Sequence, residues 1–353
     1  MLTARKHGCV PMLFLQLKKD NLQTFIPSNI LNTLKLTYQT NSLRTMLLVQ
    51  ETKKVADELH HNEIPVILLK GAATFADHLY DDLPARSMQD IDILVQPEHL
   101  REVVKVLDGL GYQRINQEGN IAPVDLDCIQ ADPDDHHLSP FYNPKFHVAI
   151  EVHYVVHHNW SGTLLPAEEV WKSAQEAKID NVPVLILAPE QRLYHNASHA
   201  LLAEHSYIKT QVSLKDLLEF SCLAEKYHTI DWQAWLKKSE QVKLVDLFSV
   251  YIQLAQVLFF LPTQELKDIS RKKRRQVKGF IDAGNYLAAN QDAGRTFEQK
   301  LTGWKLQFLY YARLPLWMWH NARYSVGGGS LSGRLKLLLR KIANSESRKK
   351  STY

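Results

Sequence analysis

Residues 66–95, VILLKGAATFADHLYDDLPARSMQDIDILV, contain the pattern that decides the fold. The run 66–69 is short and wholly apolar, which is typical of a buried strand. Gly71 then turns the chain into a helix that we expect over 72–80, and a polar loop follows. Over 90–95 charged and apolar side chains alternate, as they do on a strand with one buried face. The stretch therefore predicts a strand, a helix, a loop and a second strand.

Regular patterns continue on both sides of this stretch. Before it, apolar residues recur close to helical spacing over 28–61. After it, a helix is expected over 97–110, capped by Gly111. Alternation returns over 146–153 and predicts a half-buried strand, and a hairpin across Asp180-Asn181 is expected after that.

The rest of the chain is mostly helical in pattern. An irregular insertion is expected over 115–144, where acidic residues and prolines are frequent. Helices are predicted near 189–206, 213–227, 231–238, 241–260, 263–290 and 294–320. The triplet 327–329 predicts a glycine hinge, followed by a basic amphipathic helix over 331–342 and a disordered end. The fold class is α+β, with a helical lead-in, a mixed module, a helical region and a tail over 1–61, 62–187, 188–326 and 327–353.

Composition indicates a globular protein of the reducing cytoplasm. Of 353 residues, 45% are hydrophobic and 23% are charged, which argues against a mainly disordered chain. The 3 cysteines are widely spaced and form no disulfide framework, which favours a cytoplasmic location. The apolar stretch 10–17 is followed by no cleavage site, so we expect no signal peptide. The longest apolar run, 244–261, contains Asp246 and predicts a buried helix, not a membrane span.

Asp90 and Asp92 are the first candidates for chemistry. They stand two apart on a predicted strand, so both carboxylates leave the same face, roughly 6–7 Å apart at the backbone. Such a pair can share or bridge hard cations such as Mg²⁺, and without a cation its members repel each other. Glu151 lies on the polar face of the strand over 146–153 and completes a three-carboxylate site if the two strands are neighbours. Alone, the pair is a weak signal, because exposed strand faces often carry alternating acids.

Lys70 and Gly71 stand where the first strand passes into a helix. A glycine at such a turn lets backbone N–H groups approach a phosphate, and the helix N-terminus adds partial positive charge. Lys70 could meet the phosphate directly, and Arg86 on the following loop could clamp one. The alternative is a plain strand-to-helix turn with a surface lysine and a surface arginine.

These residues resemble the bacterial nucleotidyltransferase-like proteins of the DNA polymerase β superfamily, and within it the uncharacterised nucleotidyltransferase group. The resemblance covers roughly residues 40–225 and is most specific over 66–95. The matching residues are Leu69-Lys70-Gly71-Ala72-Ala73, Leu79-Tyr80, Arg86, Asp90-Ile91-Asp92-Ile93-Leu94-Val95, Pro97-Glu98, Gly111-Tyr112, Ile150-Glu151-Val152-His153, Leu187 to His199 and Lys215-Asp216-Leu217.

The resemblance implies a polymerase-β-like core with a mixed sheet, followed by a mainly α-helical C-terminal half that shapes the acceptor pocket. It implies that Asp90, Asp92 and Glu151 are the catalytic acids and bind two Mg²⁺ ions. The ions would hold an NTP and activate a hydroxyl of the acceptor, a small molecule, sugar or peptide, which attacks the α-phosphate and releases pyrophosphate. Two metals suit such a displacement because they stabilise both the attacking and the leaving oxygen.

The chain departs from the superfamily at one point. The glycine-serine signature that usually precedes the helix is absent, and Lys70-Gly71 takes its place, as in the resembling group. The serine that commonly contacts the triphosphate must then be replaced, and Lys70, Arg86 and Ser87 are the candidates. Metal binding is therefore better supported than the identity of the nucleotide.

Histidines are frequent between the second and third predicted strands and just beyond. They are His136, His137, His147, His153, His157 and His158. Their spacings match no zinc framework and no cysteine joins them, so the sequence does not favour zinc. His153 shares a face with Glu151, and it could lie near the metals or bond within a polar strand face.

Two other functions stay open. A non-catalytic nucleotide-binding or scaffold protein could keep this fold, although all three acids are retained. Nucleotide addition to an RNA end is compatible with a net charge of +4 and with the basic runs 271–275 and 348–350. No interleaved aromatic and basic motif supports binding to nucleic acid. We expect no stable membrane insertion.

Overall fold

The computed structural model describes residues 2–115, 120–121, 126–132, 135–157, 161–203, 211–261 and 271–289. The chain forms two compact units whose segments alternate along the sequence. Unit 1 comprises 1–156, 167–196 and 213–230, and unit 2 comprises 157–166, 197–212 and 231–353. The domain boundaries drawn from the sequence at 61, 187 and 326 stay a prediction.

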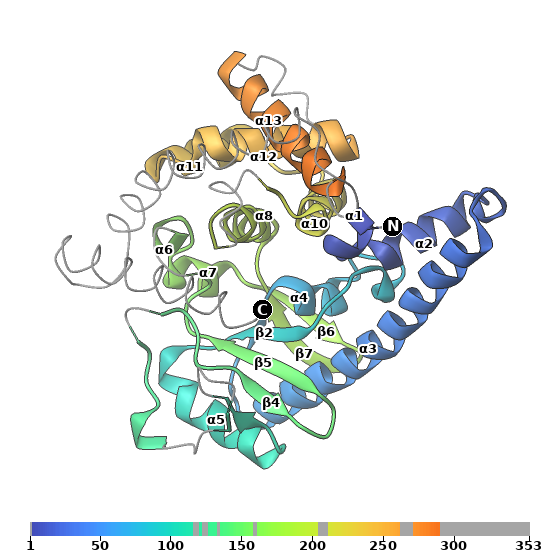
Figure 1. The fold of residues 1–353 in the computed structure, drawn as a ribbon. Helices are drawn as coiled ribbons and strands as arrows, with labels where there is room; N and C mark the ends of the chain where they lie inside the picture. The colour runs from blue at the N-terminus through green and yellow to red at the C-terminus, as the bar shows by residue number, and fades with distance from the viewer. Residues whose placement is uncertain are drawn as a thin grey trace. The chain divides into compact units, whose positions relative to one another are not determined.

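Unit 1 contains a mixed sheet with the strand order β3-β4-β5-β2-β1-β7-β6 (Figure 1). Its strands are β1 (Ile67–Leu68), β2 (Asp90–Leu94), β3 (Gln113–Arg114), β4 (Phe141–Asn143), β5 (Val148–His153), β6 (Gln175–Ile179) and β7 (Val182–Ile186). The pairs β1–β7 and β2–β5 are parallel, and the other neighbours are antiparallel. The mixed sheet and the helices around it confirm the predicted α+β class.

Helix α3 (Ser28–His61) has the bounds that the apolar spacing predicts. The other helices of unit 1 are α1 (Leu2–Lys6), α2 (Val10–Lys19), α4 (Lys70–Asp77), α5 (Leu100–Gly109), α7 (Ala167–Ser173), most of α8 (Pro189–Ser198) and α10 (Leu214–Lys226). Short 3-10 turns are η1 (Gln23–Phe25), η2 (Leu83–Ala85), η3 (Pro97–His99) and η4 (Leu126–Cys128).

One face of the sheet forms the main hydrophobic core with α3 and α5. Ile91 and Ile93 of β2 pack in one cluster with Val55 of α3 and Leu107 of α5, and all four are at most 1% exposed. Because successive side chains of a strand point to opposite faces, Asp92 lies on the other face of the sheet.

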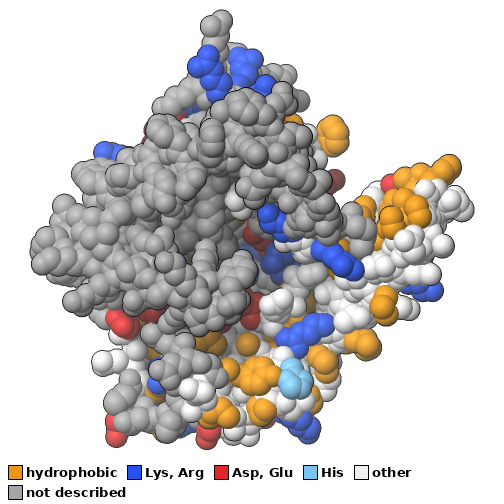
Figure 2. Space-filling model, viewed as in Figure 1, with side chains coloured by type: hydrophobic (Ala, Val, Ile, Leu, Met, Phe, Trp, Pro, Cys, Tyr) orange, Lys and Arg blue, Asp and Glu red, His pale blue; other side chains and the backbone are white. Residues whose placement is uncertain are grey.

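On the face drawn in Figure 2, hydrophobic side chains are exposed along α2 and α3. Leu36, Leu43 and Met46 of α3 are 65%, 67% and 67% exposed. Leu48 and Leu59 of the same helix are fully buried. Helix α3 therefore buries one stripe in the core and leaves other apolar side chains in contact with solvent.

Unit 2 is helical in its described part, as the C-terminal pattern predicts. Its helices are α6 (Ser161–Leu164), the π-helix η5 (His199–Ala203), α11 (Trp232–Gln241), α12 (Val245–Phe259) and α13 (Arg271–Ala289). Trp235 packs on Trp232 and Phe248, with ring centroids 5.9 and 5.0 Å apart. None of the helices in the described segments has both the length and the apolar character needed to cross a lipid bilayer.

Some sequence predictions fall outside the described residues, and others differ from the structure. The helix at 294–320, the glycine hinge and the tail helix lie outside them. Helix α4 begins at Lys70 instead of Ala72. Strand β5 begins at Val148 instead of Phe146, because the preceding residues form a turn in which His147 has φ +54°. Strand β4 lies inside the segment expected to be irregular, where its pairing with β5 supplies hydrogen bonds that the local pattern does not reveal.

Two buried ion pairs attach α10 and α8 to the segment that precedes β2. Arg86 donates from Nε to Oε2 of Glu219 in α10 at 2.5 Å, and the two side chains are 9% and 5% exposed. Asp77, the last residue of α4, accepts hydrogen bonds from Arg192 of α8 and from the hydroxyl of Tyr227. A charge buried this deeply is costly without its partner, so each pair restricts how the helices pack.

Gly71 is the point of closest approach between α4 and the loop before β2. A Cβ atom there would lie 2.2 Å from Nη1 of Arg86 and 2.6 Å from Cε of Met88. Both neighbours are buried, and Glu219 holds the guanidinium in place. The space that a side chain would need is therefore filled by protein.

Gly71→Ala is expected to destabilise the protein by about 1–3 kcal/mol, because Arg86 and Met88 must shift within a packed interior. Thermal unfolding followed by circular dichroism measures the effect. Gly109→Ala is the matched control, since a Cβ at this last residue of α5 meets no atom within 4 Å. The control is expected to be neutral or slightly stabilising, and equal melting temperatures for the two variants would contradict the packing argument.

Glu219→Leu is expected to cost about 3–5 kcal/mol, because it leaves the buried guanidinium of Arg86 without its carboxylate. The double variant Arg86→Met/Glu219→Leu replaces both charges by apolar groups of similar size and should recover most of that loss. Urea unfolding of the two variants and the parent protein tests this. A double variant as unstable as the single one would show that the pair is not the main interaction.

Candidate active site

The parallel pairing of β2 and β5 brings three carboxylates together. Asp92 lies directly opposite Glu151 in the register, and Asp90 stands two residues earlier on the same face as Asp92. The side chains of Asp92 and Glu151 are 4% and 23% exposed. The condition set by the sequence, that the two strands be neighbours, is therefore met.

Arg44 of α3 holds the beginnings of these two strands side by side. Its guanidinium donates to the carbonyl oxygen of Gln89 at 2.6 Å and to that of His147 at 2.7 Å. Gln89 immediately precedes β2, and His147 immediately precedes β5. This contact supports the register that places Asp92 opposite Glu151.

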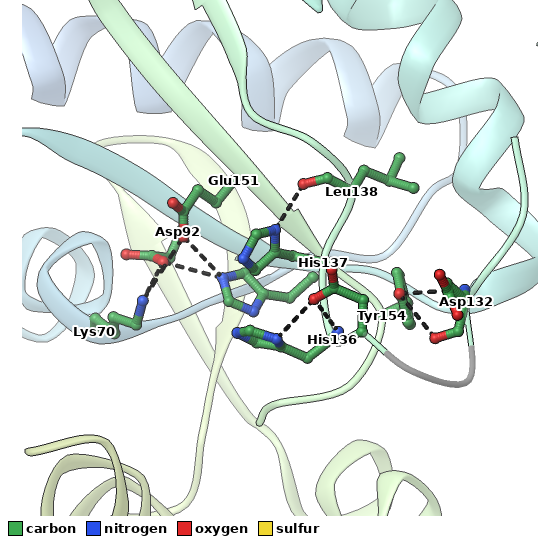
Figure 3. A network of polar contacts seen from close by, with 10 residues as sticks. Lys70, Asp92, Asp132, His136, His137, Leu138, Glu151 and Tyr154 are labelled. Atoms are coloured by element: carbon green, nitrogen blue, oxygen red, sulfur yellow. Dashed lines mark hydrogen bonds and ion pairs between the residues drawn. The ribbon is translucent and has the colours of Figure 1, made fainter. Parts of the chain in front are cut away.

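Two basic side chains contact the carboxylates, and Figure 3 labels one of them, Lys70, beside Asp92. Lys70 Nζ lies 2.6 Å from Oδ1 of Asp92 and 3.9 Å from Oε2 of Glu151. His153 Nε2 lies 3.0 Å from the same Asp92 oxygen and 3.6 Å from Oε2 of Glu151. Lys70 therefore offsets part of the negative charge. Burial acts to lower the pKa of His153, but its hydrogen bonds with Asp92 and Glu151 raise that pKa above its usual value.

The environment separates the pKa values of the three acids. Burial acts to raise the pKa of Asp92, but the hydrogen bond from His153 and the charge of Lys70 hold that pKa well below its usual range. The hydrogen bond from His153 lowers the pKa of Glu151. Burial raises the pKa of Asp90, and the charges of Asp92 and Glu151 raise it further. Of the three acids, Asp90 is therefore the one whose ionised form is least favoured. A cation at the cluster would reduce the repulsion that disfavours this form.

Lys70 occupies an unfavourable backbone conformation. Its φ is +44°, in the left-handed region, which costs a residue with a Cβ atom roughly 1–2 kcal/mol. Burial acts to lower the pKa of Lys70, but the neighbouring charge of Asp92 raises it above its usual value. The ammonium group is thereby kept charged, and its ion pair with Asp92 helps to offset the backbone strain.

The structure separates the predicted nucleotide-binding residues into two groups. Lys70 lies with the carboxylates. Arg86 lies against Gly71, and its Nε is held by Glu219, a partner for which the sequence contains no signal. Ser87 follows Arg86 and is half-buried. Contact of these residues with a nucleotide stays a prediction.

His136 and His137 also lie in this region, although the sequence, which grouped them with four other histidines, did not predict that they lie beside His153. Their ring centroids lie 5.3 and 5.2 Å from that of His153. Burial lowers the pKa of His136 to about 4, although Asp135 acts to raise it. The pair of adjacent histidines was visible in the sequence, but nothing local indicated that the segment returns to the end of β5.

The other histidines of the group lie elsewhere. His147 belongs to the turn before β5 and contacts the hydroxyl of Tyr142. His157 belongs to unit 2, where its ring centroid lies 6.0 Å from that of His199. His158 lies outside the described residues.

The donor set around Asp92 suits a divalent cation. Asp92, Glu151 and His153 each offer one ligand atom, and these atoms lie within 4.8 Å of one another. Carboxylate oxygens are the ligands that Mg²⁺ prefers in proteins, and two or more of them in one place are costly without a cation. Asp90, on the same face, adds a further oxygen donor.

Comparison with known proteins identifies a family. No curated protein matches the chain. The solution structure of the antibiotic-resistance factor ANT(2'')-Ia matches with 14% identity and a TM-score of 0.37, covering 62% of this chain and 98% of that one. That similarity is too low to support an argument about function. The model of the family described as uncharacterised nucleotidyltransferase matches residues 1–260. The chain therefore belongs to the uncharacterised nucleotidyltransferase family.

Proposed function

We propose that this nucleotidyltransferase moves a nucleoside monophosphate from an NTP to a hydroxyl group of a small molecule, a sugar or a peptide, and that it uses Mg²⁺ held by Asp90, Asp92 and Glu151. The family supports the general reaction. The observation that carries the finer proposal is the register of β2 and β5, which sets Asp92 opposite Glu151.

The carboxylates of Asp92 and Glu151 would hold the metal, because their lowered pKa values keep them ionised at neutral pH. Bound Mg²⁺ supplies charge that stabilises the attacking and leaving oxygens of an in-line displacement. His153 orients Asp92 through the 3.0 Å contact of its Nε2 with Oδ1. Asp90 would join the site when the cation removes the repulsion that now raises its pKa.

Lys70, Gly71, Arg86 and Ser87 are the proposed nucleotide-binding residues. The Lys70 ammonium lies at the carboxylates, where the phosphates would lie if the metal bridges them to the acids. Gly71 stands in the first turn of α4, whose N–H groups carry partial positive charge. Arg86 packs against Gly71, and its guanidinium group is held by Glu219. The region over 188–326 is proposed to bind the acceptor.

We also propose a cytoplasmic location. Cys9 and Cys222 are free thiols, which suits a reducing compartment. Burial raises the pKa of both thiols to about 11, so they are protonated and unreactive at neutral pH.

Asp92→Asn and Glu151→Gln are each expected to reduce nucleotidyl transfer at least about 100-fold, because either change removes a ligand charge at the metal. The assay incubates the protein with Mg²⁺, cell extract and each of four labelled NTPs in turn and measures nucleotidylated product. Glu98→Gln is the control, since this exposed acid lies just beyond β2 and outside the site. Transfer that persists in Asp92→Asn would overturn the site assignment.

Measurements of nucleotide binding, pyrophosphate release and RNA binding separate the alternatives. Nucleotide binding without pyrophosphate release under any acceptor would support a non-catalytic scaffold. Tight RNA binding that weakens strongly between two salt concentrations would support addition to an RNA end.

Asp90→Asn is expected to raise the melting temperature of the chelator-treated protein, because it removes one of three mutually repelling charges. It is also expected to reduce the increase in melting temperature that Mg²⁺ or Mn²⁺ produces in the parent protein, because a metal ligand is lost. Thermal unfolding with and without the cation measures both effects. Asp180→Asn, in the exposed β6–β7 turn, should leave the cation effect unchanged.

A further inference from the structure

Three imidazole rings lie together at the end of β5. The ring centroids of His136 and His137 are 4.3 Å apart, and those of His136 and His137 lie 5.3 and 5.2 Å from His153. Backbone pairing creates this arrangement: Leu138 N donates to the carbonyl oxygen of Val152 at 2.9 Å, and His137 bridges His153 in antiparallel fashion. Residues opposite each other in an antiparallel pair project to the same side, so His137 and His153 share a face.

We propose that His136, His137 and His153, with the carboxylate of Asp135 as a fourth group, bind one divalent metal ion that prefers imidazole nitrogen, of which Zn²⁺ is the representative. His153 also contacts Asp92 and Glu151 through Nε2, so this site adjoins the carboxylate site, and only the opposite nitrogen of the ring, Nδ1, would serve it. The proposal does not depend on nucleotidyl transfer. Asp135, His136 and His137 each offer a ligand atom, and these atoms lie within 4.8 Å of one another.

The spacing of the rings suits a single ion. In a tetrahedral site with Zn–N bonds of about 2.0–2.1 Å, an imidazole centroid lies about 3.2 Å from the metal, and two such centroids lie about 5.2 Å apart. The distances of 5.3 and 5.2 Å from His153 agree with that value. The 4.3 Å between His136 and His137 is shorter, and both side chains are half-buried, so small rotations can adjust it.

The hydrogen bonds of two rings resemble the support that metal-binding histidines receive. The Nδ1–H of His137 donates to the carbonyl oxygen of Leu138 at 2.7 Å, which leaves the lone pair on Nε2. Nε2 of His153 faces the carboxylate of Asp92 at 3.0 Å. In each ring one nitrogen is thus in contact with an oxygen, and the other nitrogen, Nε2 of His137 or Nδ1 of His153, is the one that would bind a metal.

The strongest indication of a ligand is Nδ1 of His153. The side chain is 1% exposed, and within the described residues this nitrogen has no hydrogen-bond partner. A buried ring nitrogen without a partner is costly whether it carries a proton or a lone pair. A bound metal would take the place of the proton on Nδ1 and give this nitrogen the partner that it lacks. His153 would then join Asp92 to the ion in a carboxylate–histidine–metal arrangement.

The chemistry of the donors separates this site from the Mg²⁺ site. Imidazole nitrogen binds Zn²⁺ and other first-row transition metals, whereas Mg²⁺ prefers oxygen. Excess Mg²⁺ should therefore leave an ion at the histidines in place. The sequence disfavoured zinc because the histidines follow no known spacing, and it is the return of the segment 136–138 to β5 that brings them together.

The test uses the full chain, stripped with a chelator and titrated with Co²⁺ in millimolar Mg²⁺, with visible absorption as the readout. Roughly one equivalent is expected to bind and to give the absorption of imidazole-coordinated Co²⁺, and Zn²⁺ should displace it. His136→Gln/His137→Gln is expected to weaken binding by about 100-fold or more, and Asp135→Asn by a smaller factor.

His60→Gln/His61→Gln is the matched control, because it removes two adjacent histidines at the exposed end of α3. Its Co²⁺ binding should equal that of the parent protein. Circular dichroism verifies that each variant is folded, and the single variant His137→Gln replaces the double one if the latter is not. Unchanged affinity in the folded His136 or His137 variants, displacement of the ion by Mg²⁺, or no bound Co²⁺ in the parent protein would each overturn the proposal. Loss of nucleotidyl transfer with Co²⁺ binding intact would affect only the proposed function.

Discussion

The repulsion among Asp90, Asp92 and Glu151 is the constraint on which the rest of unit 1 depends. Pairing β2 with β5 in parallel places like charges on one face, and burial increases the cost. The fold provides basic groups from two directions, with Lys70 at the start of α4 and His153 at the end of β5. Lys70 contacts Asp92 from a backbone conformation with φ +44°, in the left-handed region.

The supports of this arrangement lie in the surrounding helices. Arg44 of α3 bonds to the residues that precede both strands, so the register is held from outside the sheet. The ion pair of Arg86 with Glu219 attaches α10 to the loop before β2, and Gly71 allows α4 to pack against that loop. The positions of the acidic residues are therefore determined by contacts between residues that are distant in sequence. The acidic residues themselves lie on short segments.

Local periodicity was enough to predict much of this structure. The alternation in β2 and β5 identified the acidic face, and the apolar spacing of α3 gave its bounds, because each pattern reports burial within one element. The neighbouring position of Glu151 was a condition that the sequence could state but not test. Glu219 could not be found as the partner of Arg86, since the two are 133 residues apart and neither carries a local signal. Strand β4 and the return of His137 to β5 were hidden for the same reason.

The ion pair between Lys70 and Asp92 gives the acids a counter-charge that belongs to the protein itself. A divalent ion that bound Asp92 would therefore have to displace the ammonium group of Lys70, which would still be attached to the first residue of α4, close to the acids. Binding of the metal would then free a positive charge for an anionic ligand, so the protein would bind its anion only after its metal.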